Sequence, residues 1–386
     1  MKRIKATLLT LMLLISCIFF AGCLNYREVD EFSIVAGVAV DKEQSGQYKL
    51  TAEVVKIGGG KDTKTTSELI TGEGKTMFDA ARNMISVSGK KLYWSHAKVL
   101  ILSETVAREG VGKILDWYGR DPETREETLI LVSQAETARE IFDIPENTED
   151  IKSFQLGQII TNEKSLSKAP KTDILQFAID SQSGKAATVI PTIGLKQAEK
   201  KTVAQIMGVA IIKDDKLAGM LDGEETKYLS FIKDEIKGGI LTEEVQVRGT
   251  PTRIALEIFG SKTKTSPVIQ GNDIQMNIDI ETTVSIGEIS GNGNFIEEEG
   301  RVQLEKLAGA VLKQRVEALI EKIKMQYGAD IFGFGGKLRE DRVKVWNSVS
   351  SNWNDVFKSL KINVTATVHI KNSAGYTRNL QESESS

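Results

Sequence analysis

The residue with the clearest chemistry is Cys23, which follows a short apolar segment near the amino terminus. Three basic residues open the chain, an apolar stretch covers residues 6–20, and the segment ends in Phe20-Ala21-Gly22-Cys23. A positive start, an apolar core and small residues before the cut are typical of a secretory signal. A cysteine directly after the cut is the residue that receives a diacylglyceryl group in bacterial lipoproteins. We therefore predict a signal peptide over residues 1–22 and lipidation of Cys23, although Phe20 replaces the usual leucine.

Two alternatives for this segment stay open on the sequence alone. A plain secretory signal would leave Cys23 as a free thiol, and an uncleaved segment would act as an anchor helix, although about 17 residues is the short limit for a membrane span. Two acyl chains, at roughly 0.8 kcal/mol per buried CH₂, hold a protein stably on a bilayer, and an N-acyl chain such as palmitate can be added to the cysteine. The other cysteine, Cys17, leaves with the signal, so we expect a lipid-anchored chain without disulfides.

A second candidate for chemistry is Gly72-Glu73-Gly74-Lys75-Thr76, which resembles the end of a phosphate-binding loop. That motif needs a further glycine at position 69, where this chain has Leu69, so the backbone cradle for phosphate is incomplete. A turn that feeds a helix capped by Thr76 explains the same residues. The glycine pairs in 291–293 and 333–336 also lack the third glycine of a dinucleotide-binding loop. We predict no cofactor.

Metal and acid–base chemistry are not indicated either. The chain has two histidines, His96 and His369, and neither has a neighbour at metal-ligand spacing. His96 is placed on an expected strand over residues 91–102, where a hydrogen-bonded structural histidine is the favoured interpretation. No Gly-x-Ser-x-Gly sequence is present. We therefore predict that the chain is not an enzyme and holds no metal.

Charge excludes another class of protein. The net charge is −3, and removal of the basic signal residues takes the mature part to about −6. Aromatic residues make up 6% of the chain. A mildly acidic surface with few aromatic residues does not suit nucleic acid or an anionic membrane, so we expect the lipid, and not surface charge, to hold the chain on the membrane.

The elements that position these residues follow from hydrophobic spacing. Apolar runs at 32–41 and 48–57 flank a turn-like segment, which predicts a hairpin, and the tether over residues 24–31 spans less than about 30 Å. Strands and helices then alternate up to residue 236, as in an α/β or α+β domain. Strands are expected at 91–102, 127–132, 187–194, 203–213 and 216–221, and helices at 80–85, 111–118, 137–142, 151–161, 172–181 and 224–236. Residues 58–66 are expected to form a polar loop.

The second half has a different pattern. Beyond Gly238-Gly239, alternating apolar residues at 245–258 and 274–286 predict an antiparallel meander with one buried face. Apolar residues at three- and four-residue spacing then predict a long amphipathic helix from Glu297 to about Tyr327. A further helix is expected over 338–360 and a closing strand over 361–371. We expect the polar tail, residues 376–386, to be disordered.

Several of these segments also carry a family likeness. The residues from Cys23 to Asp41, CLNYREVDEFSIVAGVAVD, resemble the mature start of the C-subunit lipoproteins of spore nutrient-germinant receptors, the Ger(x)C family. The likeness continues along almost the whole mature chain, although Leu24 stands where many members have tryptophan. Its other landmarks are Gly74-Lys75-Thr76, Lys91–Val99 (KLYWSHAKV), Arg120-Asp121-Pro122, Met220–Glu225, Lys237–Ile240 and Ala329–Gly335.

The resemblance implies an elongated α+β protein of three mixed α/β domains, the last of which is an antiparallel sheet packed with a long helix. We expect the first domain, α/β with a helical extension, at 23–197, a small middle domain at 198–240 and the C-terminal domain at 241–375. It also implies attachment to the outer face of the cell membrane and of the inner spore membrane. The implied partners are two polytopic subunits, A and B, which together with this subunit sense amino acids, sugars or nucleosides.

Two functional hypotheses follow from these observations. The first is a non-enzymatic receptor subunit that acts through protein contacts, with a possible partner interface at Trp94, His96, Phe332 and Phe334. The second is a lipoprotein that captures a small nutrient for a transporter, which usually requires a cleft between two α/β lobes. The second half does not predict such a lobe, so we prefer the first. For the interface residues, the alternative is that Trp94 belongs to the core and that the glycines at 333–336 end the preceding helix.

Overall fold

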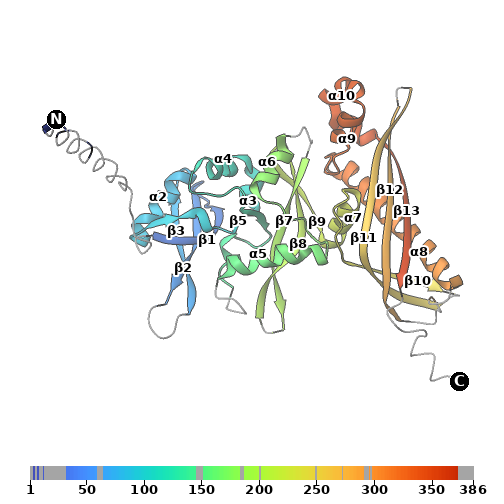
Figure 1. Cartoon of the computed structure of the whole chain (residues 1–386), viewed down its shortest axis with the longest axis horizontal. Helices are drawn as coiled ribbons and strands as arrows, with labels where there is room; N and C mark the ends of the chain where they lie inside the picture. Colours follow the sequence, from blue (N-terminus) through green and yellow to red (C-terminus); the bar gives the residue numbers. More distant parts are fainter. Residues whose placement is uncertain are drawn as a thin grey trace.

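The computed structural model describes residues 32–58, 64–144, 151–182, 187–199, 201–247, 250–271, 273–290, 295 and 298–372, with four single residues (3, 4, 7 and 12) near the start. Cys23, the rest of the predicted signal peptide and the predicted tail 376–386 lie outside the described residues. The described chain is elongated and contains two sheets, one in each half (Figure 1). None of the described helices has the length and apolar character required to cross a membrane.

The N-terminal sheet has parallel strands at its centre and antiparallel strands at both ends. Its order is β3-β2-β1-β5-β6-β7-β8-β9, with β4 also paired to β1, and β1, β5, β6 and β7 run parallel. The central strands are buried on both faces, which is why β5 reads as a continuous apolar run. The strands are β1 (Phe32–Lys42), β2 (Tyr48–Ile57), β3 (Thr65–Gly74), β4 (Lys91–Tyr93), β5 (Val99–Leu102), β6 (Leu129–Ser133), β7 (Ala187–Ala198), β8 (Lys201–Lys213) and β9 (Lys216–Asp222).

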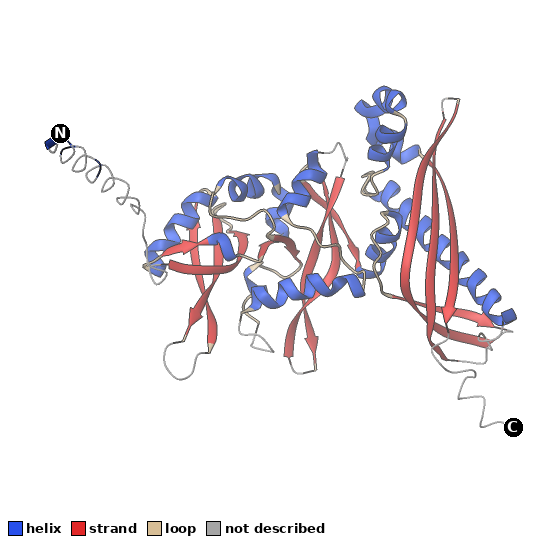
Figure 2. Ribbon diagram, in the orientation of Figure 1, coloured by secondary structure: helices blue, strands red, loops and turns tan. Residues whose placement is uncertain are grey.

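Helices cover both faces of this sheet, as parallel strands require (Figure 2). One face packs against α2 (Met77–Ser88), α3 (Glu104–Glu109), α4 (Gly112–Arg120) and α6 (Ile174–Gln182). The other face packs against α5 (Lys152–Asn162) and the short 3₁₀ turn η3 (Arg139–Ile141). Each face therefore has its own apolar core.

Several predictions for this half need correction. The polar loop expected over 58–66 is described only at 58 and 64–66, and β3, which begins at Thr65, was not predicted because it is an edge strand whose polar residues hide the period of two. The helix expected over 137–142 is only the 3₁₀ turn η3. The single strand expected over 91–102 is split by the 3₁₀ turn η2 (Trp94–His96), so that its first part pairs with Phe32–Ile34 and its second with Gly37–Val40.

The predicted middle segment, 198–240, links the two sheets. Its strands β8 and β9 continue the N-terminal sheet, so the predicted boundary at residue 197 falls inside the β7–β8 hairpin. Asp214 and Asp215 form the β8–β9 turn with φ of 48° and 69°. Helix α7 (Gly223–Ile232) contributes its apolar residues to the core of the second sheet.

The C-terminal sheet contains β10 (Ile240–Val247), β11 (Thr250–Gln270), β12 (Asp273–Ser290) and β13 (Lys361–Asn372), in that order. The first three strands are antiparallel as predicted, but β13 pairs with β12 in parallel. Helix α8 (Glu298–Gln326) runs about 43 Å back along the sheet, so β13 enters at the same end as β12. Gly309 lets α8 approach closely, because a Cβ there would lie 2.7 Å from the Ala366 carbonyl oxygen.

The helix predicted over 338–360 is three short helices instead. They are α9 (Phe334–Asp341), α10 (Val343–Val349) and α11 (Trp353–Ser359). Arg342 separates the first two with φ of −142° and ψ of 59°, which lies outside the helical region. The three helices gather at one end of the C-terminal sheet (Figure 1).

Candidate functional site

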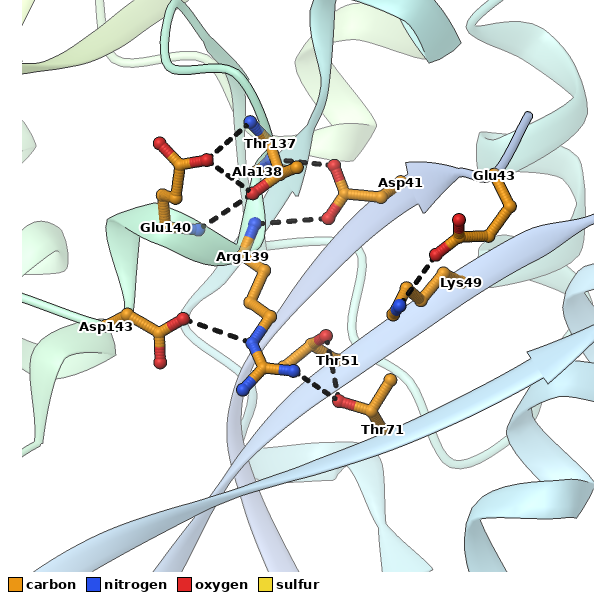
Figure 3. A network of polar contacts seen from close by, with 10 residues as sticks. All are labelled: Asp41, Glu43, Lys49, Thr51, Thr71, Thr137, Ala138, Arg139, Glu140 and Asp143. Carbon is orange, nitrogen blue, oxygen red and sulfur yellow. Dashed lines mark hydrogen bonds and ion pairs between the residues drawn. The ribbon is translucent and has the colours of Figure 1, made fainter.

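Buried carboxylates are the first groups to consider for chemistry, and the best defined are Asp41, Glu53 and Asp330. Asp41 ends β1 and accepts hydrogen bonds from the backbone N–H groups of Ala138 (2.7 Å) and Arg139 (3.1 Å), as Figure 3 shows. Arg139 in turn reaches Asp143 and Thr71. Burial raises the pKa of Asp41, and the two N–H donors oppose that rise in part. The carboxyl group holds η3 against the end of the central strand β1.

Glu53 plays a similar role on the neighbouring strand β2. Its side chain is 1% exposed and accepts from the backbone N–H groups of Lys152 and Ser153, both at 2.7 Å. The hydroxyls of Ser153 (2.5 Å) and Ser67 (2.7 Å) also donate to it. The Glu53 carboxylate thus accepts from the first amides of α5, which otherwise lack acceptors. Gly37 allows the helix to sit this close, because a Cβ there would lie 2.1 Å from Ser153 Oγ.

Asp330 is fully buried and receives four hydrogen bonds. One oxygen, Oδ1, accepts from the N–H groups of Gly333 (3.0 Å) and Phe334 (3.1 Å). The other, Oδ2, accepts from the N–H of Gly335 (2.7 Å) and from the indole Nε1 of Trp353 (3.0 Å). Burial raises the pKa of Asp330, and the four donors act in the opposite direction. The segment Ala329–Gly335 thus caps the start of α9, and the Trp353 hydrogen bond joins this cap to α11.

This cap decides the position of two predicted interface residues. Phe332 and Phe334 are 7% and 1% exposed, and their rings stack at 5.1 Å between centroids and pack against Phe357. Gly335 has no room for a side chain, because a Cβ would lie 2.8 Å from Trp353 Nε1. These side chains therefore pack inside the domain. The glycines do not end the preceding helix, as the alternative had it, because α8 ends at Gln326 and Gly333 is the N-cap of α9.

The other two predicted residues lie on η2. Trp94 is 7% exposed and meets Trp117 edge-on at 6.2 Å, so it belongs to the core. His96 is exposed and lies in the 3₁₀ turn, not on a strand as predicted; its ring is 5.8 Å from that of Tyr93. The second histidine, His369, lies on β13 with Nε2 3.4 Å from Glu281. Among the described residues, no group of three or more His, Cys, Asp or Glu side chains could hold a metal ion.

The phosphate-loop likeness also has a packing explanation. Gly72 and Gly74 lie on β3, and α2 begins after Thr76, whose hydroxyl accepts from the Asp79 N–H at 3.1 Å. A Cβ at either glycine would lie 2.4 Å from the backbone of Ala80. The glycines therefore let the helix approach the strand, as the predicted turn and capped helix require. The other glycine pair, 291–293, lies outside the described residues.

A groove of about 580 Å³ lies between α2 and α4 and contains the family landmarks at 94 and 120–122. Its apolar wall includes Trp94 and Trp117, and Phe78 stands at its edge with 54% exposure. Four of its charged residues pair with one another, Arg120 with Asp116 (2.8 Å) and Lys91 with Glu123, and Arg82 lies over the Phe78 ring. The Trp117 indole N–H is buried and meets no acceptor within the described part of the chain. Sequence spacing did not reveal this groove because its walls are more than 30 residues apart.

The fold thus defines a two-sheet, mixed α/β protein whose best-defined buried acids act as backbone caps. Residues 25–195 match the family described as the N-terminal domain of spore germination proteins. Residues 207–374 match the family described as spore germination B3/GerAC-like, C-terminal. The two matches follow one another along most of the chain. The chain therefore belongs to this GerAC-like family of spore germination proteins, which confirms the resemblance noted in the sequence.

Comparison with individual proteins agrees with this family assignment. The chain is 26% identical over 366 residues to spore germination protein B3 of Bacillus subtilis (strain 168), covering 92% of this chain and 93% of that protein. It is 20% identical to spore germination protein KC of the same organism, covering 95% and 96%. A crystal structure of the GerBC protein matches with a TM-score of 0.60 and 24% identity, over 87% of this chain and 97% of that one. This match confirms the predicted fold class.

Proposed function

We propose that the chain is a lipid-anchored, non-enzymatic subunit of a spore nutrient-germinant receptor and acts through contacts with the polytopic A and B subunits. The observation that carries the proposal is the pair of family matches that span both halves of the chain. The buried acids add support. Asp41, Glu53 and Asp330 have their oxygens occupied by backbone and side-chain donors, so they serve the fold and are not placed for acid–base catalysis.

The predicted anchor lies only a few residues before β1, and β1 pairs with a strand that lines the groove. Strand β1 begins at Phe32, about nine residues after Cys23, a reach of about 30 Å. Phe32 pairs with Lys91, which lines the α2–α4 groove. A lipid on Cys23 would therefore hold the groove near the outer face of the cell membrane or of the inner spore membrane. An integral subunit could insert an apolar side chain between α2 and α4 and offer an acceptor to the Trp117 N–H.

The test is complementation of a gene deletion, with nutrient-triggered germination measured by loss of optical density. Cys23→Ala should leave the protein unanchored and abolish the response. Phe78→Asp should slow germination at unchanged protein level, because it removes the exposed aromatic ring at the edge of the groove, over which the Arg82 guanidinium lies at 4.9 Å. Val87→Asp is the matched control: Val87 lies on the same helix with 66% exposure and is not part of the groove.

Photocrosslinking adds a direct readout. A photoreactive residue at position 78 should capture an integral subunit in native membranes, and the same residue at position 87 should not. Normal germination of the deletion strain, or equal capture from both positions, would refute the proposal. The alternative of a nutrient-capturing lipoprotein loses its structural basis in the second half, where a sheet with one long helix replaces a second α/β lobe.

A further inference from the structure

A second cavity, of about 490 Å³, lies where the end of α5, the segment 163–172, helix α6, strand β7 and the end of α7 meet. This volume is within the range of small-molecule sites. Its lining includes acidic and basic side chains together with apolar ones. Its acidic residues are Glu163, Asp180 and Glu235, and its basic residues are Lys171, Lys233 and Lys237.

Glu163 sets this cavity apart from the rest of the molecule. Its side chain is 6% exposed, and burial raises its pKa. One carboxyl oxygen accepts from the backbone N–H of Lys168, whose positive charge also favours the carboxylate, but Oε2 is buried and has no hydrogen-bond partner in the described part of the chain. The N–H groups of Leu166 and Ser167 donate to the backbone carbonyl of Glu163 and not to its side chain.

The contrast with the other buried acids is informative. Asp41, Glu53 and Asp330 receive N–H or O–H donors on both oxygens. A buried acceptor without a donor costs free energy, and more so when it carries charge. A fold that satisfies three buried carboxylates and leaves half of a fourth open beside a cavity is consistent with a donor that arrives from outside the chain.

Whereas Glu163 is buried, positively charged side chains of the cavity lie on its exposed rim. Lys171 is exposed and forms no ion pair with any described residue, whereas Lys233 is held by Glu235 at 2.9 Å. Lys237 is also exposed. Against the effect of burial, its positive charge helps Lys262 and the Thr263 N–H to lower the pKa of Asp234. The rim can therefore receive an anionic group while the buried wall receives a cationic one.

The segment between Glu163 and Lys171 is also tied to the rest of the fold. Ser167 has a φ of 56°, in the left-handed region, and its hydroxyl donates to the Gly238 carbonyl at 2.8 Å. This bond joins the segment after α5 to the segment after α7. Conformations of this kind persist only where the surroundings hold them, so the segment between Glu163 and Lys171 is tied to the segment after α7.

We propose that this cavity binds a small zwitterion, with a protonated amine donating to Glu163 and an anionic group near Lys171 and Lys237. The inference goes beyond the proposed function, because it assigns a ligand site to this chain itself and does not depend on the α2–α4 groove. It also differs from the nutrient-capturing alternative, because the cavity is lined by α5, α6, β7 and α7 and is not a cleft between two α/β lobes. A single ordered water on Glu163 is the competing account, and it predicts that no zwitterion binds.

The test uses the full-length chain in detergent, with each of the twenty protein L-amino acids as a probe at millimolar concentration. At least one should raise the melting temperature, and its affinity is then measured by calorimetry. The analogue of that amino acid without the carboxylate, and the one without the amine, should each bind about tenfold more weakly or worse. If no probe shifts the melting temperature, the proposal is overturned.

Variants locate the site. Glu163→Gln should weaken binding about tenfold or more, because a charge-assisted hydrogen bond is lost, while the ligand-free protein melts at the same temperature or higher. Lys171→Ala, at an exposed position that does not endanger folding, should weaken binding several-fold. Lys216→Ala, an exposed lysine outside the cavity, is the control and should bind normally. Unchanged binding by both Glu163→Gln and Lys171→Ala would place the ligand elsewhere and overturn the proposal.

Discussion

Replacement of Asp330 by alanine is the most direct test of the claim that Ala329–Gly335 is a structural cap. The change removes the acceptor of four N–H groups, three in the backbone at 333–335 and one on Trp353. Asp330 is 0% exposed; three of the four hydrogen bonds are buried, and the one from Gly333 is partly buried. Loss of a helix cap costs about 1–2 kcal/mol, and a stranded buried indole N–H costs about 1–3 kcal/mol.

We therefore expect Asp330→Ala to lower the free energy of unfolding of the C-terminal sheet and its helices by about 3 kcal/mol. Urea unfolding followed by tryptophan fluorescence measures the loss, and hydrogen exchange localises it to the amides of Gly333–Gly335. Asp355→Ala is the matched control on α11, because that side chain is 78% exposed and pairs only with Lys358. The control should change stability by less than about 1 kcal/mol.

A second substitution separates the cap from a general packing effect. Trp353→Phe removes the indole donor and keeps an aromatic ring beside Gly335. In the Asp330→Ala protein this donor already lacks an acceptor, so Trp353→Phe should cost less there than in the native chain. Equal costs in both backgrounds, or a loss below about 1 kcal/mol for Asp330→Ala alone, would refute the assignment of these hydrogen bonds.

Three further predictions test packing and charge. Gly335→Ala should destabilise the C-terminal half by about 1–3 kcal/mol, whereas Gly336→Ala, with open space around its Cβ, should stabilise it by up to about 1 kcal/mol; thermal unfolding compares the two. Glu53→Ala should cost about 2 kcal/mol or more and speed hydrogen exchange at the start of α5, while Glu68→Ala, in an exposed ion pair, should cost less than about 1 kcal/mol. Burial raises the pKa of Glu163 above its ordinary value of 4.5, so its contribution to stability is present below that pH and is lost as pH rises through the folded pKa; Glu163→Gln should remove this pH dependence, and parallel stability–pH curves for the two proteins would contradict it.

The sequence predicted the elements that depend only on residues close together in the chain. The hairpin at 32–57, the long strands of the second half and the helix α8 follow from apolar periodicity and turn residues, which the sequence displays directly. The cap of α2 by Thr76 also follows from local sequence. The lipidation of Cys23 is a prediction of the same kind, because a signal peptidase reads a contiguous segment.

The cap of α9 by Asp330 lay within reach of the same reasoning. An aspartate three residues before Gly333-Phe334-Gly335 is a short acceptor placed just ahead of a helix, the position in which such residues satisfy free N–H groups. The aromatic and glycine content of the segment instead suggested a contact surface. Exposure decides between the two, and exposure depends on Trp353 and Phe357 from a separate helix.

The remaining features depend on residues far apart in the chain. Asp41 meets Ala138, and Glu53 meets Lys152, 97 and 99 residues away, so nothing near either acid marks it as a cap. Strand β3 is polar because it lies at a sheet edge, and β13 is parallel because α8 returns the chain to the other end of the sheet. The sequence by itself determined which segments could form helices and strands, because periodicity is a local property. Only the tertiary structure decided which charges are buried, which partners they meet and which cavities they line, because burial is a property of the assembled elements.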